Sequence, residues 1–189
     1  MPKPLVLTKL MKITVMAAIV ALVGVSARAE QQMIIYVNNR AAPGPVLQLA
    51  EATAAGMFSG SGVRIEWHGQ TPDGGQVPLG AVAIRLVPQT PSGFLPAALA
   101  FTRPFEGVHI TVFWDRIQEA TRSASPAVIL AHVMVHEITH ILQGIDRHSD
   151  SGVMKARWTD QDYAVMAWKP LPFTPEDILL IHLGFRSKL

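Results

Sequence analysis

Residues 136–154 read HEITHILQGIDRHSDSGVM and hold three of the seven histidines in this chain of 189 residues. The first two, His136 and His140, stand four residues apart, and an acid, Glu137, directly follows the first. On a helix, side chains four residues apart lie on one face, close enough for two imidazoles to bind one metal ion. Glu137 points about 100° away, where it is better placed to contact a water molecule on the ion than to bind the ion itself.

The residues before this stretch predict that the histidines lie on a long apolar helix. Ser125 and Pro126 form a helix N-terminal signal, apolar residues continue to Gln143, and Gly144 is a residue type that ends helices. Two imidazoles and a carboxylate buried in such a helix without partners would cost on the order of several kcal/mol. A divalent cation removes that cost, so we favour a metal site over a buried pair of structural histidines.

The chain contains no cysteine. This absence excludes disulfides, a thiolate nucleophile and every zinc site that uses cysteine ligands. A metal in this protein must therefore be held by His, Asp or Glu side chains.

The N-terminal residues have the pattern of a signal peptide. Three lysines precede an apolar run over residues 13–25, and Ala27 and Ala29 place small residues at the positions that a signal peptidase recognises. We predict that residues 1–29 are removed and that the mature protein, residues 30–189, is secreted or periplasmic. The run is shorter than the roughly 20 residues of a spanning helix. An uncleaved anchor is the alternative, and only then would the protein contact a membrane.

The charge of the chain changes sign without the predicted signal peptide. Residues 1–29 carry four basic residues and no acid, which leaves 12 basic and 14 acidic residues in the remaining 160. This balance gives no electrostatic footprint for a nucleic acid. The length suits a single domain, and the sequence gives no indication of its oligomeric state.

The mature chain alternates between predicted strands and helices, which indicates a mixed α/β (α+β) domain. We expect a twisted sheet of four to five strands, a backing helix from Pro45, the long histidine helix and a small helical C-terminal part. The predicted strands are 33–37, 63–67, 81–87 and 109–114, with an extended piece at 97–101 inside a proline-rich loop over 88–107. Two further helix starts are predicted at Thr159 and at Thr174-Pro175. The strand 81–87 is the most apolar and is expected to be central.

The motif HEITHILQG, with a later His-Ser and a methionine, resembles the metzincin metallopeptidases, especially the matrixin-like ones. Their pattern is HExxHxxGxxH followed by a Met-turn, and their strands lead into the active-site helix as 81–87, 97–101 and 109–114 do here. The likeness covers residues 33–158. It implies a zinc metalloendopeptidase that hydrolyses peptide or protein substrates with a zinc-activated water, and the predicted signal peptide implies that this enzyme is exported. Its zinc ligands would be His136, His140 and His148, with Glu137 as general base and Met154 beneath the metal.

The spacing departs from the family pattern after the second histidine. The family places glycine three residues after it and the third ligand six residues after it, and here those positions hold Gln143 and Asp146. Gly144 and His148 fall one and two residues later. We favour His148 as the third ligand because neutral imidazole suits zinc, and Asp146 stays open as the alternative.

Other interpretations of the histidine motif remain open. The chain is alternatively a zinc-binding module of the cell envelope with little or no peptidase activity, or an envelope interaction protein anchored by residues 1–29. Met154 is alternatively an ordinary core methionine. Glu176 resembles the distant glutamate ligand of another zinc-peptidase class, although helix capping explains its position better. We expect four histidines to be structural: His68, His109, His132 and His182.

The extended piece at 97–101 has a predicted role in substrate binding. Peptide substrates of such enzymes extend beside the edge of a sheet, where main-chain pairing gives affinity with little dependence on sequence. We therefore expect residues 97–101 to form an exposed sheet edge.

Overall fold

The computed structural model describes residues 31–72, 76–102, 107–121 and 123–187. In these residues the elements are, in chain order, β1 (Gln31–Asn39), α1 (Gly44–Ser59), β2 (Val63–His68), β3 (Ala81–Val87), β4 (Ala100–Thr102), β5 (His109–Phe113), α2 (Trp114–Glu119), α3 (Pro126–Gln143), α4 (Asp160–Met166) and α5 (Pro175–Ser187). The expected signal peptide, residues 1–29, lies outside the described residues, so its cleavage stays a prediction. None of the described helices combines the length and apolar character needed to cross a bilayer.

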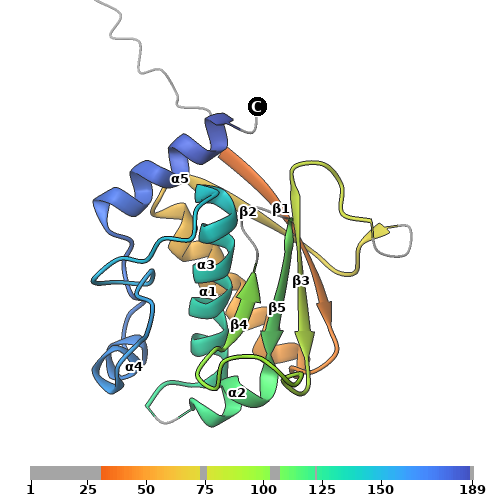
Figure 1. Ribbon diagram of the computed structural model, residues 1–189, viewed down its shortest axis with the longest axis vertical. Coiled ribbons are helices and arrows are strands. Elements are labelled where there is room, and N and C mark those ends of the chain that lie inside the picture. The colour runs from red at the N-terminus through yellow and green to blue at the C-terminus, as the bar shows by residue number, and fades with distance from the viewer. Residues whose placement is uncertain (1–30, 73–75, 103–106, 122, 188–189) are drawn as a thin grey trace, which may run out of the picture.

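The strands form one five-stranded sheet in the order β2-β1-β3-β5-β4 (Figure 1). Neighbouring strands are parallel except β4, which runs antiparallel to β5 at one edge. The prediction of a mixed α/β domain with four to five strands is therefore confirmed. β3 is the central strand, as its apolar sequence predicted.

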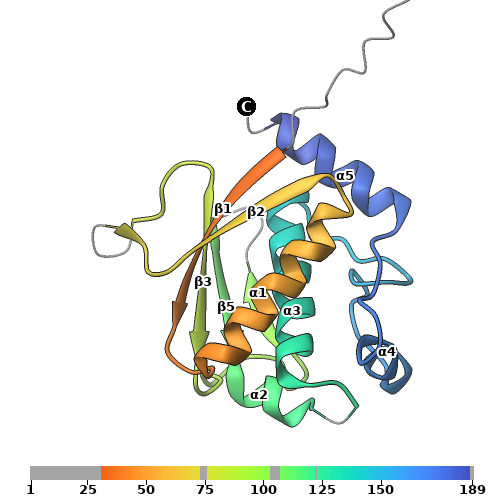
Figure 2. The same ribbon diagram turned by 180° about the vertical axis from the view of Figure 1, so that it is seen from behind.

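Helices α1 and α3 pack together on one face of the sheet (Figures 1 and 2). The strands alternate accordingly. In β2, Val63 and Ile65 are buried while Arg64 and Glu66 are exposed. In β1, Met33, Ile35 and Val37 face the core in the same way. Burial of this apolar face against the two helices is the main stabilising contribution to the domain.

The bounds of α3 agree with the local signals in the sequence. The hydroxyl of Ser125 accepts a hydrogen bond from the backbone N–H of Val128 at 3.4 Å, and Pro126 occupies the first turn. Gly144 ends the helix in the left-handed conformation, with φ of 67°. A residue with a side chain is strained at such an angle, and glycine is not. The chain therefore leaves α3 sharply and turns back toward the histidines.

Two predictions around the proline-rich loop are wrong in detail. Trp114 does not end a strand, because it begins the short helix α2. Of the predicted extended piece 97–101, only Ala100 and Phe101 pair with a neighbour, and the strand β4 extends one residue further to Thr102. Residues 95–98 form a turn instead, in which the backbone N–H of Ala98 donates to the carbonyl of Leu95. Arg116 of α2 donates to the carbonyls of Leu95 and Ala98, so the helix holds this turn in place.

Helix α5 packs closely against the C-terminal end of α3. A Cβ atom on Gly184 would lie 1.8 Å from the backbone oxygen of Leu142, so only glycine permits this approach. The side-chain amide of Gln143 donates to the backbone carbonyl of Asp177 at 3.3 Å. These contacts place the first turn of α5 beside the loop that follows α3.

Candidate metal centre

His136 and His140 meet on α3 with their Nε2 atoms 3.1 Å apart. Nδ1 of His136 lies 2.9 Å from the carbonyl oxygen of Val153, and Nδ1 of His140 lies 3.3 Å from that of Ile145. A carbonyl only accepts, so each Nδ1 carries the proton and each Nε2 presents a lone pair. Such backbone partners fix the tautomer and orientation of histidines that bind metals.

Both imidazoles are held in the neutral form that binds a metal. Burial, together with the neighbouring His140, lowers the pKa of His136 to about 3. Burial also lowers the pKa of His140, and His148 adds to this effect. The Nε2 atoms of His136 and His140 are therefore unprotonated, as metal binding requires.

The turn after Gly144 brings His148 to the two helix histidines. Its ring centroid lies 5.2 Å from that of His136 and 4.9 Å from that of His140. One nitrogen from each of the three rings falls within 4.8 Å of the others. Asp146 lines the same pocket but lies outside this group of three. The geometry thus brings together the three predicted metal ligands, and their binding of a metal stays a prediction.

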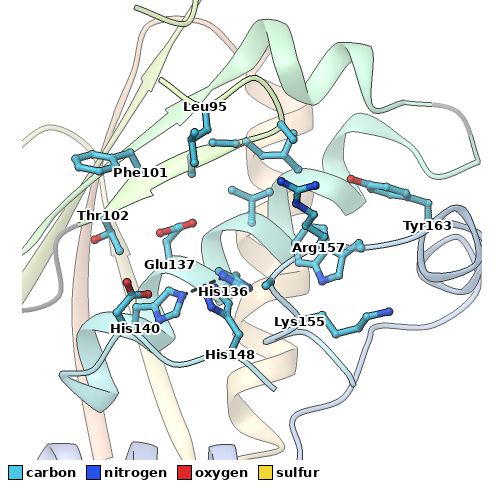
Figure 3. Close-up of a pocket in the computed structure, with 18 residues that line it drawn as sticks. Leu95, Phe101, Thr102, His136, Glu137, His140, His148, Lys155, Arg157 and Tyr163 are labelled. Atoms are coloured by element: carbon cyan, nitrogen blue, oxygen red, sulfur yellow. Dashed lines mark hydrogen bonds between the residues drawn. The ribbon is translucent and has the colours of Figure 1, made fainter. Parts of the chain in front are cut away.

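Glu137 lies in the same pocket between β4 and the histidines (Figure 3). Burial raises the pKa of its carboxyl to about 8, and the negative charge of Asp146 adds to the rise. A carboxyl group that titrates near neutral pH is suited to exchanging protons with a bound reactant. Its catalytic role stays a prediction.

The predicted Met-turn residue, Met154, is fully buried and belongs to the main core. Its backbone oxygen accepts from the N–H of Ser149 at 2.8 Å, and the preceding residue, Val153, supplies the carbonyl that contacts His136. Val153 is fixed in turn by a bond from its N–H to the carbonyl of Pro172. The turn thus supports both the first helix histidine and the loop of the third.

The pocket above the histidines has a volume of about 460 Å³. Residues 97–102, which include β4, form one wall, and residues 155–158 with Tyr163 form the opposite wall (Figure 3). Two cations line it. Lys155 is paired with Asp162, whereas the exposed side chain of Arg157 has no ion-pair or hydrogen-bond partner within the described part of the chain. Figure 3 shows Arg157 toward the Tyr163 side of the pocket, away from Thr102.

Two of the histidines expected to be structural and the alternative ligand Glu176 have partners outside the histidine group. His132 bonds the carbonyl of Val128 at 2.7 Å and accepts from the N–H of Leu171 at 3.0 Å, as a structural histidine should. His182 contacts Gln31. Glu176 pairs with Arg147 and lies outside the histidine group.

Sequence reasoning missed a buried cluster next to His148. Asp177 accepts hydrogen bonds from Ser149 and Arg147, the two neighbours of that histidine. The only relevant signal in the sequence was the helix start at Thr174, which indicated a cap and not a contact with residues 147–149.

Comparison with known proteins bears on the fold. No protein-family model and no curated protein sequence matches this chain. Among solved structures, the chain is similar to the crystal structure of archaemetzincin from Methanopyrus kandleri, with a TM-score of 0.58 and 13% identity. The similarity covers 86% of this chain and 99% of that chain. The chain has a metzincin-like fold. A fold of this kind does not determine function by itself, because function depends on the side chains at the site.

Proposed function

We propose that the protein is a zinc-dependent metallopeptidase. The observation that carries this proposal is the group of three histidine nitrogens within 4.8 Å of one another, on the floor of a pocket that also contains Glu137. The similarity to archaemetzincin supports the proposal at the level of the fold.

The donor set fits zinc. Three neutral imidazoles match the preference of zinc for nitrogen ligands, and three protein ligands leave one coordination position for water or substrate. His136, His140 and His148 would hold the ion, with Asp146 as the alternative third ligand. Zinc, when bound, supplies Lewis acidity that activates a water molecule and polarises a peptide carbonyl.

Glu137 is proposed to carry the proton. Its carboxylate accepts a proton from the attacking water and returns it to the nitrogen of the leaving amine. A nearby divalent cation favours the ionised carboxylate, which opposes the raised pKa that burial gives to Glu137. Glu137 would therefore be ionised, and able to act as a base, when the metal is bound.

Substrate would lie along β4. This strand pairs with β5 on one side only and lines the pocket that contains Glu137. An extended peptide can add to such an edge through main-chain hydrogen bonds. This arrangement would place a peptide bond of the substrate near Glu137 without requiring a particular sequence.

Arg157 is proposed to select acidic substrates. Its guanidinium has no partner among the described residues, and it borders the pocket beside Trp158 and Tyr163. A carboxylate near the scissile bond could form a charge-assisted, bidentate contact with it. We expect peptides with Asp or Glu close to the cleaved bond to be preferred.

Export is part of the proposal. The basic, apolar and small-residue segments of residues 1–29 are the support for cleavage before Glu30. Expression in a bacterium with a secretory pathway should yield a protein whose mass corresponds to a start at Glu30. Recovery of a protein that still carries residues 13–25 would contradict export by cleavage and favour the anchored alternative.

The peptidase proposal is tested by zinc content and hydrolysis of an unfolded protein such as casein. We expect one zinc per chain, loss of hydrolysis with a chelator and recovery on adding zinc. Glu137→Gln should keep its zinc and lose activity by roughly 10²- to 10⁴-fold, the usual contribution of a general base. Asp150→Asn, a change to an exposed acid outside the pocket, should have no effect.

Two results would point elsewhere. A wild-type protein that binds zinc and cleaves nothing would favour the alternative of a zinc-binding module without peptidase activity. Loss of zinc in Glu137→Gln would show that the glutamate is a ligand and would contradict its role as a base.

A further inference from the structure

The position of His148 in the site depends on its neighbours in the chain. It is exposed, and no hydrogen bond to its imidazole occurs in the described part of the structure, unlike the rings of His136 and His140. It also lies on a loop and not on a helix. Its position relative to the other two histidines must therefore come from the backbone on either side of it.

Both neighbours of His148 bind one buried carboxylate. The hydroxyl of Ser149 donates to Oδ1 of Asp177 at 2.6 Å, and Nη1 of Arg147 donates to the same oxygen at 3.1 Å. The side chain of Asp177 is completely buried, so these bonds are not exchanged readily with water. Charge-assisted hydrogen bonds of this kind are among the stronger ones in proteins.

The two oxygens of Asp177 have separate partners. Oδ2 accepts from the backbone N–H and the hydroxyl of Thr174 at 2.9 and 2.7 Å, which caps the start of α5. Oδ1 is left for Ser149 and Arg147. A carboxylate fills both positions at once, whereas an amide has only one acceptor oxygen.

Helix α5 gives this carboxylate a fixed position. Gly184 allows α5 to pack directly on the backbone of α3, and Gln143 of α3 bonds the backbone carbonyl of Asp177. The helix that carries His136 and His140 is thus linked to the residue that holds the loop of His148.

We propose that Asp177 is a positioning residue that holds His148 in place for the metal by binding Arg147 and Ser149. The proposal rests on the proposed zinc site. It predicts that the identity of residue 177 affects metal affinity although the side chain itself does not touch the ion.

The competing explanation is that Asp177 only caps α5. The chain offers a matched control, because Asp162 occupies the same position in a capping box at the start of α4, with Thr159 as the cap and Lys155 as its cation. Asp162 has no described contact with the loop that carries His148. A general loss of helix capping would therefore be equal in the two variants, and a loss of positioning would not.

The experiment measures zinc affinity of the full chain by competition with a chelator. Asp177→Asn should weaken zinc binding roughly 10- to 100-fold, the usual effect of an outer partner of a metal ligand. Asp162→Asn should stay within about threefold of the wild type. Thr174→Ala removes the hydroxyl that donates to Oδ2 and accepts from the backbone N–H of Asp177, and it leaves Oδ1 bound to Ser149 and Arg147. It should lower thermal stability and leave the affinity nearly unchanged.

A milder variant keeps the test valid if Asp177→Asn folds poorly. Ser149→Ala removes one hydroxyl and should weaken zinc binding in the same direction. The double variant Ser149→Ala/Asp177→Asn should bind zinc no more weakly than Asp177→Asn alone, because the side chains of Ser149 and Asp177 act through one hydrogen bond. Wild-type affinity in both single variants would overturn the positioning role.

The result separates this inference from the proposed function. If the wild-type protein binds no zinc, the proposed function fails and residue 177 has nothing to position. If the wild type binds zinc and Asp177→Asn and Asp162→Asn have equal affinities, the site stands and only the positioning role is wrong.

Discussion

Nδ1 of His136 lies 2.9 Å from the carbonyl oxygen of Val153, a residue 17 positions later in the chain. This bond orients the first ring of the cluster through the turn that contains Met154. The second ring is oriented by the carbonyl of Ile145. The backbone therefore sets the direction of both helix histidines before any metal binds, and the third ligand determines whether the cage is complete.

The third ligand can be identified by paired alanine variants. His148→Ala should weaken zinc binding by well over 100-fold, because two ligands four residues apart on a helix make a poor cage. Asp146→Ala should cost at most roughly 10- to 100-fold, as an outer partner would. Zinc affinities from chelator competition decide between them. Loss of the metal from Asp146→Ala and its retention in His148→Ala would move the third ligand to Asp146.

The buried carboxylate of Asp177 should make the free energy of unfolding depend on pH in the acidic range. Burial alone would raise its pKa, but hydrogen bonds from Ser149, Thr174 and Arg147 hold the pKa below the ordinary value of 3.8. A group with a lowered pKa in the folded state stabilises the fold above its ordinary pKa, and this contribution disappears as the pH falls through the folded value.

The metal-free protein allows this dependence to be measured without zinc. At about pH 6, Asp177→Asn should lower the free energy of unfolding by on the order of 2 kcal/mol. The difference from the wild type should shrink below about pH 4, as measured by denaturant unfolding across the pH range. A difference that stays constant down to the acid transition would contradict the lowered pKa.

Arg157 should control the preference for acidic substrates. Arg157→Gln should reduce kcat/KM for peptides with an acid near the cleaved bond by roughly tenfold, which is the size expected for a charged hydrogen bond of about 1.5 kcal/mol. Neutral peptides should change little, and added salt should reduce the difference. Arg40→Gln is the matched control, because Arg40 is exposed and does not line the pocket. Equal losses for acidic and neutral peptides would rule out selection by charge.

Alanine substitutions at two helix glycines, Gly184 and Gly56, should change the stability of the protein in opposite directions. Gly184→Ala places a methyl group 1.8 Å from the backbone oxygen of Leu142, so α5 must move away from α3. It should cost about 1–3 kcal/mol of unfolding free energy. Gly56 in α1 has open space around it, and Gly56→Ala should stabilise the protein by about 0.5–1 kcal/mol. Thermal unfolding of the two variants tests the packing, and a stabilised Gly184→Ala protein would contradict it.

The parts of the fold that were predictable depend on local signals. The bounds of α3 follow from Ser125, Pro126 and Gly144, which act within one turn of the helix ends. The strand 81–87 was predicted with its correct bounds because its apolar run ends at a turn on each side. Its central place also agrees with its mostly apolar sequence, although Arg85 of this strand is exposed on the face that the helices do not cover.

The parts that failed depend on partners distant in the sequence. Helix α2 has only six residues, too few for a helical period to be visible, and Asp115 in it is fixed by Thr90. The bounds of β4 are set by pairing with residues 110–112 of β5 and not by its own sequence. In the metal centre, the spacing of His136, Glu137 and His140 was informative because a helix fixes it. The contact between Ser149 and Asp177 joins residues 28 positions apart, so no local sequence pattern predicts it.

The three histidines lie close together in the chain, and this affects the order in which the metal site and helix α5 form. Closing a loop costs entropy that grows with its length, by about 0.6 kcal/mol for each doubling. Residues 136–148 therefore meet at low entropic cost, whereas Asp177 must close a longer segment before it can contact Ser149. We expect the histidines to capture a metal before α5 docks. Docking would then act mainly on how slowly the metal dissociates.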